Sequence, residues 1–328
     1  MNSLSSAKKL KSKRLKIQNS KILCIGDIIL DKYVKGKANR ISPEAPVPII
    51  KVENESFEMG GAANVARNIT GLGGRVILIG LNGSDMSSKI VKSLISNNKK
   101  IASDFIKIKN YITPLKTRII SSSTQLIRVD EEDNFFKINK HNEKLIIKKV
   151  RKHIKKVKTI IISDYNKGLL TEKLIEKILD IADSHNVDTL IDPKKHIKYY
   201  KGANVITPNI KEFQDLFIES KKTNSKNIIY EARNIIKKYK IREMLITMSE
   251  KGMLYISPKT SKKFKALSKE IYDVTGAGDT VIATLAIMNN IGMKTVDSAD
   301  IANVAASIVV CKPGTTIITL EELLKELR

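Results

Sequence analysis

The sequence of 328 residues has no tryptophan, only two cysteines and no long hydrophobic run. No apolar stretch approaches the ~20 residues that a membrane-spanning helix needs. Cys24 and Cys311 both lie in apolar contexts, so we expect two reduced core residues and no disulfide framework. The four histidines do not have metal-ligand spacing. These absences exclude a membrane-spanning protein and a disulfide-stapled secreted domain, and they favour a cytoplasmic protein.

Acidic residues are also scarce: 34 Asp and Glu stand against 59 Lys and Arg, a formal net charge of +25. Such an excess is found in nucleic-acid-binding proteins. Those proteins gather basic side chains among aromatic ones, whereas aromatics here make up 5% and the lysines are spread along the chain. An AT-rich genome imposes the same bias on any protein. We therefore expect no nucleic-acid partner, and only a general attraction of phosphorylated small molecules.

The order of apolar and polar runs divides the chain into an extension and one large domain. Residues 1–20 are basic without an apolar core, so they predict a frayed or helical extension and not a signal peptide. Residues 21–328 alternate β-like and helical runs. The expected strands are 22–25, 76–81, 159–163, 189–191, 205–207, 244–247 and 253–256, and the expected helices are about 60–69, 86–97, 141–156, 171–184, 226–239, 297–311 and 320–327. This alternation predicts an α/β fold with a doubly wound, mostly parallel sheet flanked by helices.

Two segments do not follow the alternation. Residues 33–58 contain Pro43, Pro46 and Pro48 among short alternating pieces, which suit an irregular sheet or flap better than a core element. Residues 105–130 resume such pieces. We predict that the two segments form a small β lid beside the main sheet.

Polar residues follow the predicted strands where each one ends. In parallel sheets, ligands collect at the carboxyl ends of the strands. The polar strand ends are Asp27, Asp164, Asp192, Asn209 and Thr247. This concentration predicts an active site at that edge of the sheet.

The stretch from Tyr272 to Thr280 places two glycines and Asp279 just before an apolar run. It predicts a turn into the start of a buried helix, where unpaired N–H groups and the helix dipole favour an anion. Small residues let a phosphate approach the backbone closely. The alternative is an ordinary helix start in which Asp279 is a capping residue. The polar strand ends favour the anion site.

Two signatures in the sequence resemble those of the ribokinase-like (PfkB) carbohydrate kinases. The first is Gly60-Gly61-Ala62-Ala63-Asn64, preceded by Asp27 and Asp31. The second is Asp273-Val274-Thr275-Gly276-Ala277-Gly278-Asp279. The resemblance extends from about Lys21 to the C-terminus. Within this family, the sequence most closely resembles the heptose 7-phosphate kinases. The residues that carry this closer resemblance are 26–31, 40–48, 125–130, 163–168 and 207–209.

The resemblance implies transfer of the ATP γ-phosphoryl group to the anomeric hydroxyl of D-glycero-β-D-manno-heptose 7-phosphate, a step toward ADP-heptose and lipopolysaccharide core. The backbone N–H groups of Gly276, Ala277 and Gly278 would hold the transferring phosphoryl group. Asp279 would accept the hydroxyl proton. A carboxylate beside a helix N-terminus is expected to have a low pKa, so Asp279 would take the proton late, in a loose transition state.

The resemblance also implies an acceptor site. Its expected residues are Asp27, Asp31, Gly60, Gly61, Asn64, Arg128, Asp164 and Lys167. Arg128 is the candidate for the 7-phosphate because a guanidinium binds phosphate through two hydrogen bonds. Lys167 and Lys194 are secondary candidates in so lysine-rich a chain. For the aspartates, the alternative is turn capping.

The implied nucleotide site is at the other strand ends. Its expected residues are Lys194, Asn209, Glu212, Thr247, Ser249, Gly252 and Asn303. Asn209 and Glu212 match the family's Asn-x-x-Glu element, which organises Mg²⁺ through water; as an alternative or in addition, Asn209 caps the helix that carries Glu212. Asp273 and Thr275 match a monovalent-cation position, and dependence on K⁺ is a hypothesis.

The resemblance leaves several alternatives open. The His-x-Gly-His motif of the nucleotidylyltransferase domain that commonly follows this kinase does not occur in the 328 residues, so we expect a stand-alone kinase or one half of a larger protein. Rival functions are another sugar or nucleoside kinase of this fold, and a non-catalytic sugar-phosphate-binding protein. The intact Asp279, Asn209 and Glu212 argue against the second. Relatives often dimerise through the lid, so we expect a homodimer.

Overall fold

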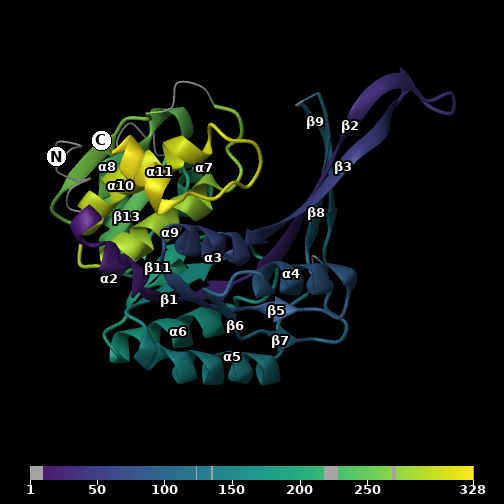
Figure 1. The fold of residues 1–328 in the computed structure, drawn as a ribbon. Coiled ribbons are helices and arrows are strands. Elements are labelled where there is room, and N and C mark those ends of the chain that lie inside the picture. The colour runs from purple at the N-terminus through teal and green to yellow at the C-terminus, as the bar shows by residue number, and fades with distance from the viewer. Residues whose placement is uncertain (1–9, 123, 134–135, 218–227, 268–270, 328) are drawn as a thin grey trace.

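The computed structural model describes residues 10–122, 124–133, 136–217, 228–267 and 271–327 (Figure 1). Within these residues, the main sheet has nine strands in the order β15-β14-β13-β12-β11-β10-β1-β4-β6. Their bounds are β1 Lys21–Gly26, β4 Arg75–Ile79, β6 Ile101–Ser103, β10 Thr159–Ser163, β11 Asp188–Asp192, β12 Val205–Ile206, β13 Glu243–Thr247, β14 Met253–Ile256 and β15 Ser261–Phe264. The pairs from β6 to β13 are parallel, and β14 and β15 extend the sheet in antiparallel fashion. The expected mostly parallel sheet is confirmed.

Helices cover both faces of this sheet. Successive residues of β1 point to opposite faces: Ile22 and Cys24 pack in one buried cluster, and Leu23 and Ile25 in the other. The first cluster takes in α3 Ala62–Gly71, α4 Met86–Ser96, α9 Ala277–Asn290, α10 Thr295–Val309 and α11 Leu320–Glu326; the second takes in α5 Lys140–His153, α6 Glu172–Ser184 and α8 Ile228–Lys238. Figure 1 shows α3 and α9 above the sheet and α5 and α6 below it. The sheet is therefore doubly wound, as the alternation of the sequence predicts.

The lid is a second sheet that projects from the body (Figure 1). Its strands are β2 Ile28–Ile41, β3 Pro48–Gly61, β8 Leu115–Ser121 and β9 Thr124–Glu131, in the order β3-β2-β8-β9. Residues 33–58 form the expected irregular sheet outside the core, with two register shifts, but the expected short pieces are instead one long antiparallel hairpin of β2 and β3. Pro43 and Pro46 lie in its tip and Pro48 is the first residue of β3, so none of the three interrupts the ladder.

The expected strand 76–81 is interrupted at Gly80. The expected second lid segment, residues 105–130, also differs, because only its later part belongs to the lid. The chain continues as β5 Leu81–Asn82, which pairs with β7 Ile106–Lys107 in a separate small sheet. A side chain at position 80 would place its Cβ 2.6 Å from Cγ1 of Ile28, where the lid hairpin begins. Because β7 pairs with β5 and not with a lid strand, the lid part of the segment 105–130 begins with β8.

The described part of the N-terminal extension packs on the body. Helix α2 Arg14–Gln18 buries Ile17, and Leu10 is also fully buried. Of the two cysteines, Cys24 is buried as expected but Cys311 is exposed, because it follows the end of α10 at the surface. Among the helices of the described residues, none combines the length and the apolar character needed to cross a membrane.

Candidate active site

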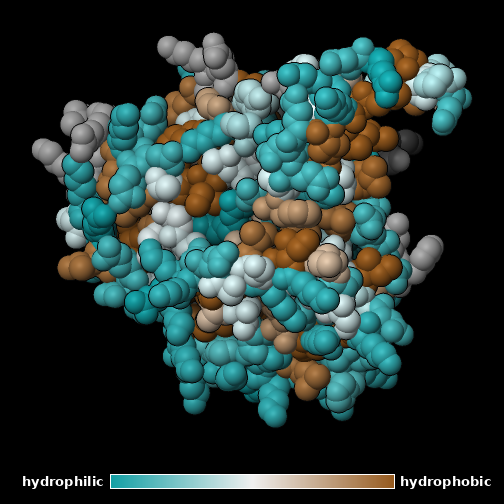
Figure 2. All heavy atoms as spheres, turned by 45° about the vertical axis from the view of Figure 1, so that its right-hand side comes forward, coloured by the Kyte–Doolittle hydropathy of each residue, from teal (hydrophilic) through white to brown (hydrophobic). Residues whose placement is uncertain are grey.

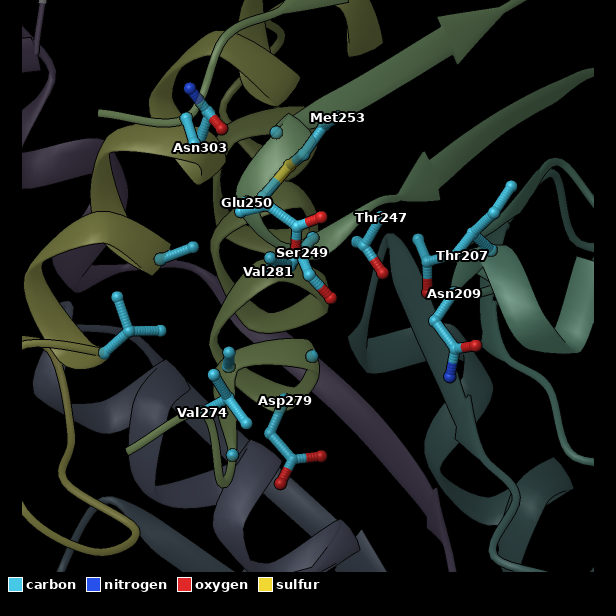
Figure 3. A pocket seen from close by; sticks show the side chains of 18 of the residues that line it. Thr207, Asn209, Thr247, Ser249, Glu250, Met253, Val274, Asp279, Val281 and Asn303 are labelled. Carbon is cyan, nitrogen blue, oxygen red and sulfur yellow. The ribbon is translucent and has the colours of Figure 1, made fainter. Parts of the chain in front are cut away.

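The carboxyl ends of β11, β12 and β13 meet the start of α9 around a cavity of about 560 Å³ (Figure 3). The structure brings eleven of the expected residues together in its lining: Lys194, Asn209, Glu212, Thr247, Ser249, Gly252, Gly276, Ala277, Gly278, Asp279 and Asn303. In Figure 3, Asp279 lies at the start of α9, and the side chains of Thr247 and Asn209 lie across the cavity from that helix. The cavity therefore joins the expected catalytic turn to the expected nucleotide residues.

The turn before α9 depends on its glycines. Gly276 has a φ of +79°, and a Cβ there would lie 2.8 Å from Nδ2 of Asn64. Open space lies where a side chain of Gly278 would be, and the N–H of Gly278 has no acceptor among the described residues. The N–H of Ala277 differs, because it donates to the carbonyl of Val274 at 3.2 Å. An anion can therefore approach the backbone most freely at Gly278.

Asp279 is buried in the first turn of α9 and accepts two hydrogen bonds. Nδ2 of Asn64 donates to Oδ2 at 2.7 Å, and the hydroxyl of Tyr165 donates to Oδ1 at 2.7 Å. Burial raises the pKa of Asp279 to about 6, although both hydrogen bonds act in the opposite direction. This direction is opposite to the low pKa that the sequence led us to expect, because desolvation outweighs the hydrogen bonds from Asn64 and Tyr165. A carboxylate of this pKa is ionised at neutral pH and is a better base than an ordinary aspartate.

Tyr165 links the catalytic turn to the end of β1. Its hydroxyl binds Asp279, and its backbone N–H donates to Oδ2 of Asp27 at 2.9 Å. Burial and the charge of Asp279 raise the pKa of Tyr165 well above its usual value, so the hydroxyl stays protonated as a donor. Tyr165 lies in the segment 163–168 that resembles the heptose 7-phosphate kinases, but no role was predicted for it. Its partner is 114 positions away, which no local pattern reveals.

Asp27 has one oxygen that is satisfied and one that is not. Oδ2 accepts the backbone N–H groups of Tyr165 and Lys167. Oδ1 is buried and has no hydrogen-bond partner among the described residues. Burial and next the charge of Asp164 raise the pKa of Asp27 to about 6. An unpartnered buried oxygen is costly unless a ligand donates to it, so Oδ1 is available to a hydroxyl group.

Asp31 and the glycine pair form the base of the lid. Nη1 of Arg118 donates to Oδ1 of Asp31 at 2.6 Å, and both side chains are buried. A Cβ at Gly60 would lie 2.3 Å from Oδ2 of Asp31, and Gly61 has a φ of +57°. The glycines therefore let the two strands of the hairpin close around the carboxylate. Arg118 was not predicted.

Two expected acceptor residues are already held by the protein. Asp164 is fully buried and accepts hydrogen bonds from Nζ of Lys195 and from the hydroxyl of Tyr200, the latter at 2.8 Å. Lys167 forms an ion pair with Glu132. None of the expected acceptor residues lines the 560 Å³ cavity: Asp27, Asp31, Gly60, Gly61, Asn64, Arg128, Asp164 and Lys167.

Asn209 and Glu212 bind each other at the start of α7 Ile210–Glu212. Oδ1 of Asn209 accepts the N–H of Glu212, and Oε2 of Glu212 accepts the N–H of Asn209, both at 2.9 Å. The capping alternative is therefore correct. The other carboxylate oxygen of Glu212 pairs with Lys194. Glu212 and Asp192 both line the cavity, and carboxylates are the ligand type that hydrated Mg²⁺ uses beside nucleotide phosphates.

The remaining expected residues lie away from this cavity. Asp273 accepts the N–H groups of Thr275 and Gly314, and it lines a second cavity of about 610 Å³ between the lid and residues 313–317. Arg128 lies on β9, with its side chain about half exposed, and lines neither cavity. In the described part of the chain, no group of three acidic, histidine or cysteine residues is arranged to hold a metal ion.

The amino-acid sequence is similar to those of known proteins. Residues 19–322 match the model of the pfkB family carbohydrate kinase. The chain is 40% identical over 308 residues to "Bifunctional protein HldE" of Vibrio vulnificus and 39% identical over 308 residues to the protein of that name from Haemophilus influenzae. Both matches cover 93% of this chain and 63% of the relative, so the chain spans less than two thirds of these proteins.

Solved structures show the same fold. Phosphofructokinase-2 from Escherichia coli, in complex with substrates and products, has a TM-score of 0.78 at 16% identity and covers 94% of this chain and 98% of its own. Ribokinase from Arabidopsis thaliana, complexed with ribose and ATP, has a TM-score of 0.68 at 15% identity, with 94% and 99% covered. The fold is therefore the ribokinase-like α/β fold.

Proposed function

Because the chain belongs to the pfkB family of carbohydrate kinases and is a sugar kinase, we propose that it phosphorylates D-glycero-β-D-manno-heptose 7-phosphate at the anomeric hydroxyl. The product would be the 1,7-bisphosphate, a precursor of ADP-heptose and lipopolysaccharide core, made in the cytoplasm. The observation that carries the chemistry is the pair of buried carboxylates, Asp27 and Asp279, joined through Tyr165. The choice of heptose is supported by the 40% identity to the HldE relative.

In this proposal the residues of the body align acceptor and phosphoryl group. Oδ1 of Asp27 accepts a sugar hydroxyl, and Asn64 and Tyr165 hold the carboxylate of Asp279 toward the anomeric hydroxyl. Asp279 removes the proton as the bond to phosphorus forms. The backbone around Gly278 stabilises the charge that develops on the transferring phosphoryl group. Asp31, Gly60 and Gly61 close the acceptor side. Arg128 approaches the 7-phosphate from the lid, and Lys167 approaches it from the loop that follows β10 of the body.

The nucleotide takes the 560 Å³ cavity in this proposal. Thr247, Ser249, Gly252 and Asn303 contact the adenosine, and Lys194 the phosphates. Mg²⁺, held through water by Glu212, would neutralise charge on the phosphates. Asp273 and Thr275 are the proposed K⁺ position, and titration of activity with KCl against NaCl tests it: no difference would remove K⁺ from the proposal.

We also propose a homodimer through the lid. Several large apolar residues of the lid are exposed: Ile41, Val47, Val52, Leu126, Ile127 and Val129. Figure 2 shows brown, apolar atoms on the projecting end of the lid. Exposed apolar patches of this kind mark protein contacts. The double variant Ile127→Asp, Val129→Asp is expected to convert a dimer to a monomer in light scattering, and a wild-type protein that is already monomeric would contradict the proposal.

A coupled ADP-release assay over a panel of acceptors tests the reaction. The panel is heptose 7-phosphate, fructose 6-phosphate, fructose, ribose and adenosine. We expect the highest kcat/KM with heptose 7-phosphate, and ³¹P NMR should place the new phosphate on the anomeric carbon. A higher kcat/KM with another acceptor would overturn the heptose assignment and leave a different sugar or nucleoside kinase. Binding without any turnover would favour a sugar-phosphate sensor.

A further inference from the structure

One face of the lid carries two rows of polar side chains across three strands. The register aligns Asp31 of β2, Lys116 of β8 and Asp130 of β9 in the first row. It aligns Tyr33, Arg118 and Arg128 in the second row. Because side chains at alternate positions of a strand share a face, both rows lie on one side of the lid.

This face is turned toward the body and the acceptor site. In the second row, the hydroxyl of Tyr33 accepts the backbone N–H of Thr315 at 3.2 Å. In the first row, the negative charge of Asp31 helps to raise the pKa of Asp279. Asp31, at the end of the first row, is therefore within electrostatic reach of Asp279.

Three cations around these rows already have a carboxylate partner. Arg118 is paired with Asp31 at 2.6 Å. Arg128 forms two hydrogen bonds with Asp130, at 2.8 and 3.0 Å. Lys167 is paired with Glu132. An anionic ligand that used any of these side chains would have to compete with the existing partner.

Lys116 differs from the other three. Its side chain is half-buried, and it forms no ion pair with any residue that the structure describes. Burial lowers the pKa of Lys116, and the positive charges of Lys167 and Arg128 act in the same direction, only partly opposed by Asp130 and Asp31. The charged form of a partly desolvated ammonium group beside two other cations is destabilised, and a bound anion would stabilise it.

We propose that Lys116 binds the phosphate group of the acceptor and so makes this kinase select phosphorylated sugars. Arg128 and Lys167 flank that phosphate and add positive potential while keeping their own carboxylates. The acceptor then spans the site, with its reacting hydroxyl at Asp279 and its phosphate at the lid. This inference rests on the proposed function, because it assigns one end of the same acceptor.

The test compares Lys116→Met with wild type on two acceptors that differ only in the phosphate, heptose 7-phosphate and heptose. A charged hydrogen bond is worth enough that KM for the phosphorylated acceptor should rise about 30-fold. The kcat should change by less than about twofold, and kcat/KM for unphosphorylated heptose should not change, since Lys116 does not contact the reacting atoms. Lys116→Arg should restore most of the affinity.

A matched control removes a lysine of the same lid that has a carboxylate partner. Lys37 is exposed and paired with Glu53, so Lys37→Met makes the same charge change and should leave both acceptors unaffected. A second measurement does not depend on turnover: inorganic phosphate should raise the Tm of wild type and of Lys37→Met, but not that of Lys116→Met.

The outcomes separate this inference from the heptose assignment. If wild type prefers another sugar phosphate, the heptose assignment fails, and Lys116 is tested with that sugar phosphate and its unphosphorylated counterpart. If wild type prefers unphosphorylated sugars, or if Lys116→Met changes KM equally for both members of a pair, the role of Lys116 is overturned. An unchanged phosphate-dependent Tm shift in Lys116→Met would overturn it as well.

Discussion

The proposed acceptor site lies between two regions whose charged side chains differ in burial and pairing. On the body, Asp27 and Asp279 are buried, and burial raises the pKa of each to about 6. On the lid, charged side chains are paired at or near the surface, either between neighbouring strands, as in Lys37–Glu53, or within β9, as in Arg128–Asp130, and β9 is exposed along its whole length. Buried carboxylates suit proton transfer, whereas half-exposed cations suit recognition of a charged substrate. In the proposed function, this comparison assigns the chemistry to the body and the choice of acceptor to the lid.

The largest expected effect comes from removing the carboxylate of Asp279, the proposed general base on the body. We expect Asp279→Asn to lower kcat by about 10³-fold, because general-base catalysis typically contributes that much. The affinity for ATP, measured by calorimetry, should stay within about threefold, since the amide keeps the shape of the carboxylate. Asp180→Asn, on the exposed face of α6, is the matched control. Near-native turnover of Asp279→Asn would show that the base lies elsewhere.

On the lid, Arg128→Ala should act on binding and hardly on chemistry. The side chain is half exposed and already bound to Asp130, so we expect KM for the phosphorylated acceptor to rise about tenfold. Steady-state kinetics should show kcat within about twofold. An unchanged KM would remove Arg128 from the acceptor site, and a large loss of kcat would contradict the division between lid and body.

The smallest predicted effect concerns Tyr165, whose hydrogen bond favours the ionised form of Asp279. Without this bond in Tyr165→Phe, the pKa of Asp279 should rise above about 6. The active form is the carboxylate, so activity should be lost at a higher pH than in wild type. We expect an additional loss of about threefold at pH 6 relative to pH 8. A pH profile of kcat/KM with an unshifted acid limb would show that Tyr165 does not tune the base.

The sequence predicted most of the main sheet, because parallel strands covered on both faces are continuous apolar runs bounded by polar ends. Strands such as Thr159–Ser163 and Met253–Ile256 have the predicted bounds. The lid was harder to predict. The three prolines of residues 33–58 suggested interruptions, but they lie at the tip and the start of the hairpin, which only the pairing of β2 with β3 decides.

The candidate site was predictable where its chemistry is local, as in the glycine turn at Gly276. The pKa of Asp279 was not, because burial and the contact with Asn64, 215 positions away, arise only from tertiary packing. The proposed phosphate-binding role of Lys116 could not be predicted from the sequence for a related reason. In a chain this rich in lysine, only the register across β2, β8 and β9 distinguishes it from its neighbours.

The reciprocal cap of Asn209 and Glu212 has a consequence for anyone who wishes to engineer this enzyme. The two side chains close the first turn of α7, and the same two side chains line the proposed nucleotide cavity. With the proposed nucleotide site, the local stability of α7 and the affinity for the metal–nucleotide complex would depend on the same pair of residues. A substitution made there for one property would then be expected to change the other.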